Sequence, residues 1–207
     1  PTVLGVIPEE LINLLTKHEL LPMTKKGDRQ LIADHCVDFI GVNYYQPMRV
    51  QAPENPKFPA QTPEDLYANY IWPERKINPY RGWEIYPEVL YDVAMMMKND
   101  YHNIPWYVSE NGMGVADEEH FMGEDGQIQD DYRIEFMQEH LTQLHRAIEA
   151  GSSCFGYHTW TFNDCWSWLN GYRNRYGFYC VDLDHEVKRT MKKSGRWYRE
   201  LSENNGF

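Results

Sequence analysis

The sequence has few cysteines, no excess of positive charge and no long apolar run. Its four cysteines include no CxxC pair, which argues against a zinc site and against a disulfide framework. The formal net charge is −11, whereas binding to nucleic acid or to anionic membranes needs basic patches. No apolar stretch approaches the roughly 20 residues of a membrane span, and no signal peptide is recognisable. These absences predict a reduced, cytoplasmic protein without a nucleic-acid or membrane partner.

Hydrophobic and aromatic residues are abundant. Of 207 residues, 42% are hydrophobic and 14% aromatic, with seven Trp and fifteen Tyr. This content can build a sizeable core. It also suits a sugar-binding cleft, where flat rings cover the C–H faces of a pyranose, and composition alone does not choose between the two.

Strand-like and helix-like segments alternate along the chain, with no linker or short repeat. The chain begins without Met and enters a helix near Pro8, so we expect part of a longer protein. Alternating strands and long helices predict an α/β fold with a parallel sheet. We expect strands at 37–45, 105–110 and 154–162, helices at 87–101, 130–151 and 188–203, a long loop at 53–87, and a short stretch outside the main sheet at 177–183.

The near-continuous apolar run at 37–45 predicts a strand covered on both faces. At 105–110, a run of β-forming residues ends in Glu110, and the Asn-Gly pair that follows is typical of a turn. Carboxyl ends of parallel strands share one edge of a sheet, where active sites collect. The expected rim contains Asn43, Tyr44, Tyr45, Glu110, Asn111, Thr159 and Trp160. A carboxylate beside phenols and indoles could attack an anomeric carbon.

Six segments, in this order, carry a resemblance: VDFIGVNYY, GWEIYPEVLYD, YVSENGMG, DDYRIEFMQEHL, YHTWTFNDCWSWLNGYRNRYGFYCVDLD and KKSGRWYRE. They resemble glycoside hydrolase family 1, the retaining β-glycosidases built on a TIM barrel. The resemblance covers nearly the whole chain. It implies that residues 1–207 form a single partial domain, the C-terminal part of a (β/α)8 barrel with strands six to eight and their helices.

The resemblance also implies roles for the rim residues. Glu110 matches the catalytic nucleophile, and Tyr45 matches the tyrosine whose hydroxyl contacts it and favours its ionised form. Trp160 matches the tryptophan on which the sugar packs. Asn43 is expected to orient its neighbours at the rim.

The loop after the third strand resembles one branch of the family, the 6-phospho-β-glycosidases. Ordinary β-glucosidases carry a glutamate followed by Trp where this chain has Ser167 and Trp168. A carboxylate there would repel a 6-phosphate by at least about 1 kcal/mol per charge pair even in water. Ser167, a lysine and a tyrosine bind the phosphate in that branch, and Tyr176 occupies the tyrosine position.

The match is incomplete because Asn174 stands where the lysine is expected. Arg173 and Arg175 flank this position, and an arginine fork suits phosphate well. The expected ligand is therefore a small-molecule β-glycoside, with a 6-phosphate or without one. The main alternative is an ordinary β-glucosidase or β-galactosidase.

A second carboxyl group is needed for retaining hydrolysis. In this family it belongs to an Asn-Glu-Pro motif, which the chain lacks. We therefore expect the chain to be inactive alone and to pair with the missing N-terminal half or with itself. A non-catalytic sugar-binding half-barrel is a further alternative, although such a module has no need for Glu110 and Tyr45 together.

Other residues offer weaker candidates. His158 lies inside the third strand and is expected to be a core histidine, and the remaining histidines show no metal-ligand spacing. Ser109 has no GxSxG motif around it. The acidic runs 117–119 and 124–125 are expected in a solvated loop. No cofactor and no metal site is expected.

Overall fold

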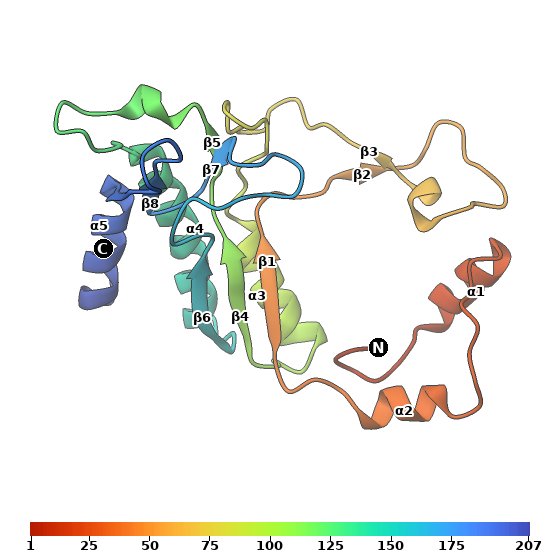
Figure 1. Cartoon of the computed structure of the whole chain (residues 1–207). Helices are drawn as coiled ribbons and strands as arrows, with labels where there is room; N and C mark the ends of the chain where they lie inside the picture. The colour runs from red at the N-terminus through yellow and green to blue at the C-terminus, as the bar shows by residue number, and fades with distance from the viewer. The chain divides into compact units, whose positions relative to one another are not determined.

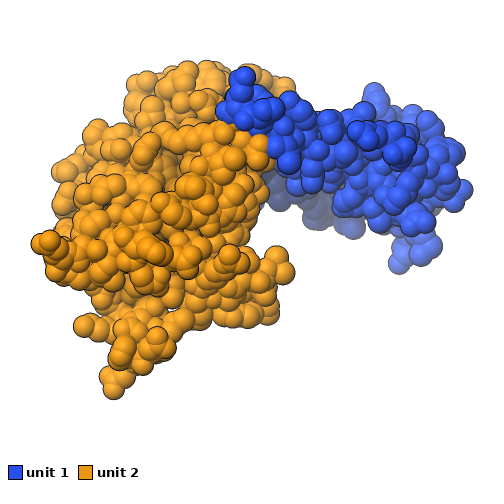
Figure 2. Space-filling model, turned by 90° about the horizontal axis from the view of Figure 1, so that it is seen from above, with its two compact units in different colours: residues 1–40, 48–74 blue, residues 41–47, 75–207 orange.

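The structure is a computed structural model that describes residues 1–207, and the chain divides into two compact units. The first unit comprises Pro1–Ile40 and Met48–Glu74, and the second comprises Gly41–Pro47 and Arg75–Phe207. Figure 2 shows them in different colours. All of the expected rim residues fall in the second unit.

The first unit contains short elements. Helix α1 begins after Pro8, as predicted, whereas the second helix was not predicted. The buried His18 accepts a hydrogen bond at its Nδ1 from the backbone N–H of Ala60 at 3.0 Å. The elements are α1 (Glu9–Lys17), α2 (Asp28–Asp34), the antiparallel pair β2 (Val50–Gln51) and β3 (Ala68–Asn69), and a 3-10 turn, Pro63–Leu66.

A three-stranded sheet forms the centre of the second unit. Its strands, in spatial order, are β1 (Ile40–Tyr44), β4 (Trp106–Asn111) and β6 (Cys154–Thr159), and β4 pairs with β6 in parallel. Figure 1 shows the three strands side by side with their arrowheads at one edge. The three predicted strands are therefore confirmed, with small shifts at their ends.

Helices α3 (Val89–Asp100) and α4 (Asp131–Glu149) contact each other and lie behind the strands in Figure 1. Alternate β4 residues, Trp106 and Val108, are fully buried, as expected for a pleated strand with one face on a core. The helices bury Leu90, Ala94, Met97, Phe136, Met137, Leu144 and Ala147. The predicted helices at 87–101 and 130–151 are confirmed.

The opposite face of the sheet is open, which contradicts the expectation of a strand covered on both sides. Gly41 and Asn43 of β1 are exposed while Tyr44 is buried. On β6, His158 is exposed and its ring meets that of Tyr107 at 5.4 Å, so it is not a core histidine. The physical reason is that α3 and α4 cover only one face of these three strands.

The C-terminal part differs from prediction at one point. A helix was expected from residue 188, but Arg189–Met191 form strand β9, and helix α5 spans Lys193–Asn204. Strand β9 pairs antiparallel with β8 (Tyr179–Val181), so backbone pairing overrides the local helical pattern. Strand β8 lies outside the main sheet, as predicted. The remaining elements are β5 (Val115–Ala116), β7 (Asn174–Arg175) and a 3-10 turn, Glu118–Phe121.

Candidate active site

The rim of the sheet is held together by Asn111, the last residue of β4. Its side chain is fully buried. It donates from Nδ2 to the carbonyl of Tyr44 at 2.7 Å and accepts at Oδ1 from the hydroxyl of Tyr157 at 2.6 Å. One amide therefore links all three strands, a role that the sequence patterns did not reveal.

Glu110 and Tyr45 meet at this rim. The Tyr45 hydroxyl donates to Oε2 of the half-buried Glu110 at 2.6 Å. Burial, together with the bond to Glu110, raises the pKa of Tyr45 well above its ordinary value, so the phenol remains a donor at physiological pH. The Tyr45 ring packs edge-on against Trp83 and Tyr176, with centroids at 5.9 and 6.1 Å.

Trp160 follows β6 directly and lies close to the Glu110 segment. Its backbone N–H donates to the carbonyl of Asn111 at 2.8 Å, and its peptide bond to Thr161 is cis. A Cβ at Gly112 would come within 2.1 Å of the Trp160 carbonyl oxygen, so only glycine permits this approach. Trp160 is 37% exposed, so part of the residue remains open to solvent.

Asn43 lies on the open face near the same edge. Its Oδ1 accepts a hydrogen bond from the hydroxyl of Ser109 at 2.7 Å. Asn43 thus holds the side chain of Ser109 in place, and its expected orienting role at the rim stays a prediction. The same bond gives Ser109 a structural partner.

Ser167 and Trp168 stand at the tip of the loop after β6. The backbones of Ser167 and Gly171 exchange two hydrogen bonds of 2.9 Å, which close a tight hairpin. Trp168 is 90% exposed and packs edge-on against Trp166 at 4.9 Å. The loop therefore presents the Trp168 indole outward from a closed turn, beside a half-buried Ser167.

Tyr176 lies deeper in the same loop and is 8% exposed. Its ring packs so closely on Gly114 that a Cβ there would come within 2.4 Å of the ring carbon that carries the hydroxyl. Burial raises the pKa of Tyr176 to about 12, although the nearby Arg81 opposes this shift. Tyr176 is therefore a neutral hydroxyl beside Tyr45.

The three residues before Tyr176 point in different directions. Arg173 is exposed, and Asn174 is 9% exposed in β7, where its backbone pairs with Ala116 of β5. The side chain of Arg175 is 15% exposed and approaches the carboxylate of Asp164 at 3.8 Å. Arg175 thus has a partner within the protein, and Arg173 is the one free to meet solvent.

A buried ionic cluster lies beneath the loops, and the sequence patterns missed it. The Arg133 guanidinium bonds to Glu118 at 2.6 Å and also to Asp130, and the Lys192 ammonium bonds to Asp164 at 2.9 Å and to Glu118. Glu118 is 2% exposed, so the solvated loop expected at 117–119 is wrong at this position. The expected exposure of 124–125 is confirmed.

The cluster fixes the loops that carry the candidate site. Burial alone would raise the pKa of Glu118, but Arg133 and Lys192 outweigh it and hold this pKa below its ordinary value. Arg133 also donates to the carbonyl of Arg175 at 3.0 Å, and Asp164 accepts from the backbone N–H of Gly177 at 2.9 Å. Two members of the ionic cluster, Arg133 and Asp164, therefore hold the backbone on either side of Tyr176 in place.

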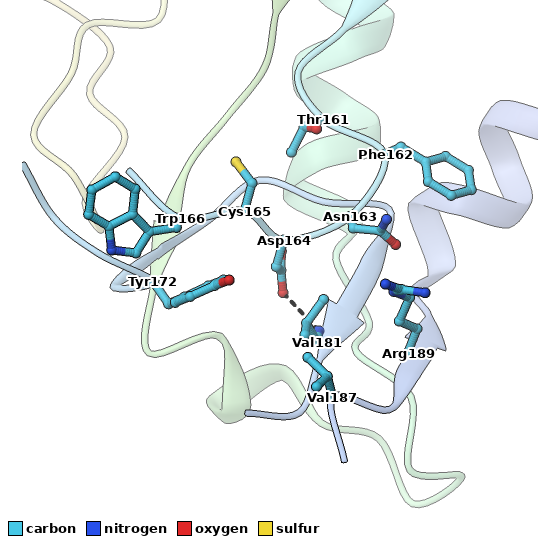
Figure 3. A pocket seen from close by; sticks show the side chains of 10 residues that line it. All are labelled: Thr161, Phe162, Asn163, Asp164, Cys165, Trp166, Tyr172, Val181, Val187 and Arg189. Carbon is cyan, nitrogen blue, oxygen red and sulfur yellow. Dashed lines mark hydrogen bonds between the residues drawn. The ribbon is translucent and has the colours of Figure 1, made fainter. Parts of the chain in front are cut away.

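A hollow of about 350 Å³ lies on the loop after β6 (Figure 3). Its floor includes Asp164, whose carboxylate already binds Lys192 and the backbone of Val181. None of Glu110, Tyr45 or Trp160 lines it, so we do not place the candidate site there. The lining residues are Thr161, Phe162, Asn163, Asp164, Cys165, Trp166, Tyr172, Val181, Val187 and Arg189.

No group of three or more His, Cys, Asp and Glu side chains comes together in a way that could hold a metal ion. No helix combines the length and the apolar character needed to cross a membrane.

Parallel strands that end at one rim, with packed helices behind them, define a protein of the α/β class. The comparison with protein families agrees. The chain belongs to glycosyl hydrolase family 1, whose model matches residues 1–207.

Relatives and solved structures support this membership. The 6-phospho-beta-glucosidase GmuD of Bacillus subtilis is 50% identical over 100% of this chain and 45% of its own length. The aryl-phospho-beta-D-glucosidase BglC of the same species is 34% identical over 98% of this chain and 45% of its length. A beta-glucosidase from Thermotoga maritima, solved in complex with noeuromycin, matches with a TM-score of 0.82 and 31% identity over 100% of this chain and 43% of its own.

The chain therefore spans a little under half the length of the curated relatives that it matches. Together with its parallel strands, this shows a partial barrel.

Proposed function

We propose that this chain contributes the nucleophile and part of the sugar pocket to a retaining β-glycoside hydrolase that acts on 6-phospho-β-glucosides or galactosides. The observation that carries the proposal is the 2.6 Å hydrogen bond from Tyr45 to Glu110 at the carboxyl edge of the sheet. This bond holds one carboxylate oxygen of the proposed nucleophile in a fixed position at the rim.

In the proposed reaction the Glu110 carboxylate attacks the anomeric carbon as the glycosidic C–O bond breaks. The leaving oxygen takes a proton from a second carboxylic acid, and water later hydrolyses the glycosyl ester to regenerate Glu110. Trp160 packs on the sugar ring, and Asn43 orients side chains at the rim. In this proposal the acid is supplied by a residue outside this chain, because the chain has no Asn-Glu-Pro motif.

The phosphorylated substrate is proposed from Ser167, Trp168 and Tyr176. Ser167 replaces a carboxylate that would repel phosphate, and it supplies a hydroxyl donor. Two of the relatives named above are described as acting on phosphorylated glucosides. Of the flanking arginines, Arg173 remains a candidate for a phosphate contact, whereas Arg175 approaches Asp164.

For the assembly, we propose that β1, β4 and β6 are strands six, seven and eight of a barrel, within one partial domain that spans residues 1–207. The open face of the sheet then requires further strands, supplied by an N-terminal half or by self-association. The isolated chain is expected to show no ordinary turnover, because it lacks the acid/base residue.

A second candidate is an ordinary β-glucosidase. The observation that favours it is Asn174, which stands where the phosphate-binding branch has a lysine. The beta-glucosidase from Thermotoga maritima also shares this fold. A non-catalytic sugar-binding half-barrel is less favoured, because a binding module does not need a carboxylate aimed by a phenol.

The nucleophile is tested by trapping. The barrel would be completed by placing, before this chain, the part of the 50% identical Bacillus relative that the chain does not match. A 2-deoxy-2-fluoro β-glycoside with a 6-phosphate should label Glu110 covalently, as peptide mass spectrometry would show. Glu110→Gln should abolish labelling, and an adduct on another residue would refute the proposal.

The substrate class is tested by comparing nitrophenyl β-glucoside and β-galactoside with their 6-phosphates in the same completed barrel. We expect the larger kcat/KM for the phosphorylated compounds. A preference for the unphosphorylated compounds would support the ordinary β-glucosidase instead. Robust turnover by the isolated chain would contradict the proposed absence of an acid/base residue.

A further inference from the structure

Arg81 lies beside the candidate site. Neither the family resemblance nor the local sequence pattern assigned it a role. Its guanidinium carbon stands 3.7 Å from the centroid of the Trp83 ring and 5.5 Å from that of Tyr176. Both rings pack against Tyr45, which bonds to Glu110. A positive charge is therefore held among the aromatic side chains that pack on Tyr45, the hydrogen-bond partner of the proposed nucleophile.

A tight turn fixes the position of Arg81. The backbone N–H of Asn78 donates to the carbonyl of Trp83 at 2.8 Å, and that of Gly82 donates to the carbonyl of Asn78 at 2.7 Å. Gly82 has a φ of +78°, which glycine adopts without strain. The buried Asn78 side chain donates from Nδ2 to the carbonyl of Gly114 at 2.8 Å, so the turn is tied to the segment that follows Glu110.

The Arg81 guanidinium has no anionic partner. It forms no ion pair, its Nε–H is buried without a hydrogen-bond acceptor, and ring faces are its only partners. Stacking on rings leaves the N–H groups at the edge of the guanidinium plane available for an anion. A half-buried cation in a chain of net charge −11 would usually find a carboxylate, so the missing partner points to a ligand.

The loop that carries Ser167 and Tyr176 has no cation at the position where the phosphate-binding branch has a lysine, although Arg173 beside it is exposed. Asn174 is neutral and mostly buried, and Arg175 approaches Asp164. Arg81, in contrast, reaches the ring of Tyr176 from a different segment of the chain. It can therefore supply, from the turn at 78–83, a positive charge next to Tyr176 that neither Asn174 nor the paired Arg175 provides.

We propose that Arg81 is the cation that recognises the phosphate of the substrate, acting together with Tyr176 and Ser167. This inference rests on the proposed function, and it assigns phosphate specificity to a residue outside the family's phosphate-binding loop. A phosphate monoester dianion can accept two N–H bonds from one guanidinium fork, which a carbohydrate hydroxyl cannot match in strength.

The first test observes Arg81 directly in the chain as it stands. The Nε–Hε resonance of Arg81 is assigned in the NMR spectrum of ¹⁵N-labelled protein by its absence from the spectrum of Arg81→Lys. This resonance is then followed during separate titrations with glucose 6-phosphate, inorganic phosphate and glucose. We expect a shift with both phosphate compounds and none with glucose. A response to glucose alone, or no response to either phosphate compound, would overturn the inference.

The second test measures the ratio of kcat/KM for a 6-phospho-β-glucoside to that for the unphosphorylated β-glucoside in the completed barrel. Arg81→Met should lower this ratio by about 10- to 100-fold, the loss typical of one hydrogen bond to a charged group. Arg81→Lys retains the charge without the fork and should give an intermediate ratio. Equal losses on both substrates would indicate a structural role and refute the proposal.

Two further variants complete this test. Arg199→Met removes an equal charge from an exposed position on α5 and should leave the ratio within about twofold of wild type. If Arg173→Met abolishes the preference while Arg81→Met does not, Arg173 is the phosphate-binding cation and the inference fails. If wild type shows no preference for phosphate, the proposed function itself fails.

Discussion

The hydroxyl of Tyr45 donates a 2.6 Å hydrogen bond to Oε2 of Glu110, across 65 residues of sequence. The two residues come from the ends of different segments of the central sheet, and neighbouring aromatic rings hold the phenol in place. Because burial keeps Tyr45 protonated, the bond persists through the whole neutral range. The orientation of the Glu110 carboxylate is thus set by the packing of the sheet, and not by the loop that follows Glu110.

Removal of this donor should slow formation of the covalent intermediate. In the completed barrel, Tyr45→Phe should lower kcat/KM by about 10- to 100-fold, the factor expected for a hydrogen bond to a charged group. The rate of labelling by a 2-deoxy-2-fluoro glycoside should fall to a similar extent. Tyr91→Phe on α3, where the ring lies against Arg146, serves as the control. Equal effects of the two variants would contradict the role of Tyr45.

The bridge formed by Asn111 should contribute strongly to stability. Asn111→Leu removes both the donor to the Tyr44 carbonyl and the acceptor for the Tyr157 hydroxyl. Leaving two buried polar groups unpaired should cost about 2–4 kcal/mol of unfolding free energy. Urea denaturation measures this loss. As a control, Asn204→Leu at an exposed position on α5 should change the unfolding free energy by less than about 0.5 kcal/mol. An equal loss in both variants would contradict the stabilising role of the Asn111 hydrogen bonds.

Sequence patterns predicted the features that depend on neighbouring residues. The β-forming run before Glu110, the Asn-Gly that follows it and the periodicity of α4 all reflect local backbone preferences. Strand positions followed from these, and the shared edge of parallel strands placed the candidate site. The meeting of Tyr45 with Glu110 also followed, but from the family resemblance rather than from local pattern.

Features that depend on distant partners could not be predicted in this way. Glu118 belongs to an acidic run whose sequence predicts a solvated loop. It is buried instead, because it pairs with Lys192, 74 residues further along the chain. Residues 189–191 have a helical pattern, yet they pair with β8. Arg81 lies in a Pro-rich loop, and only its contacts with the rings of Trp83 and Tyr176 show that it is near the candidate site. In each case a long-range contact overrides the local signal.

Loss of the central cation from the buried ionic cluster should destabilise the second unit severely. Lys192→Met leaves Glu118 and Asp164 buried without this partner, and an uncompensated buried charge costs about 3–5 kcal/mol. The adjacent Lys193 offers a matched control, because it forms an exposed pair with Asp131. Lys193→Met should cost less than about 1 kcal/mol. Similar melting temperatures for the two variants would show that the cluster contributes little.

His140 should make stability fall as the pH falls from about 6.5 to about 4. Its ring is fully buried in α4, Nδ1 lies 2.7 Å from the Phe136 carbonyl, and Nε2 has no partner. Burial lowers the pKa of His140 from 6.5 to about 4. On acidification the His140 ring therefore takes up a proton at a higher pH in the unfolded chain than in the folded chain. The contribution of this ring to stability is present above pH 6.5 and is lost as the pH falls toward 4.

The full effect is about 3 kcal/mol, from about 1.4 kcal/mol per pKa unit. His140→Met should remove this part of the pH dependence, so the difference in unfolding free energy between wild type and variant should shift by about that amount between pH 7 and pH 4. Urea denaturation across this range measures it. His145→Met, which removes an exposed histidine from the same helix, should retain nearly all of the wild-type pH dependence. Parallel curves for wild type and His140→Met would mean that the buried ring does not titrate as described.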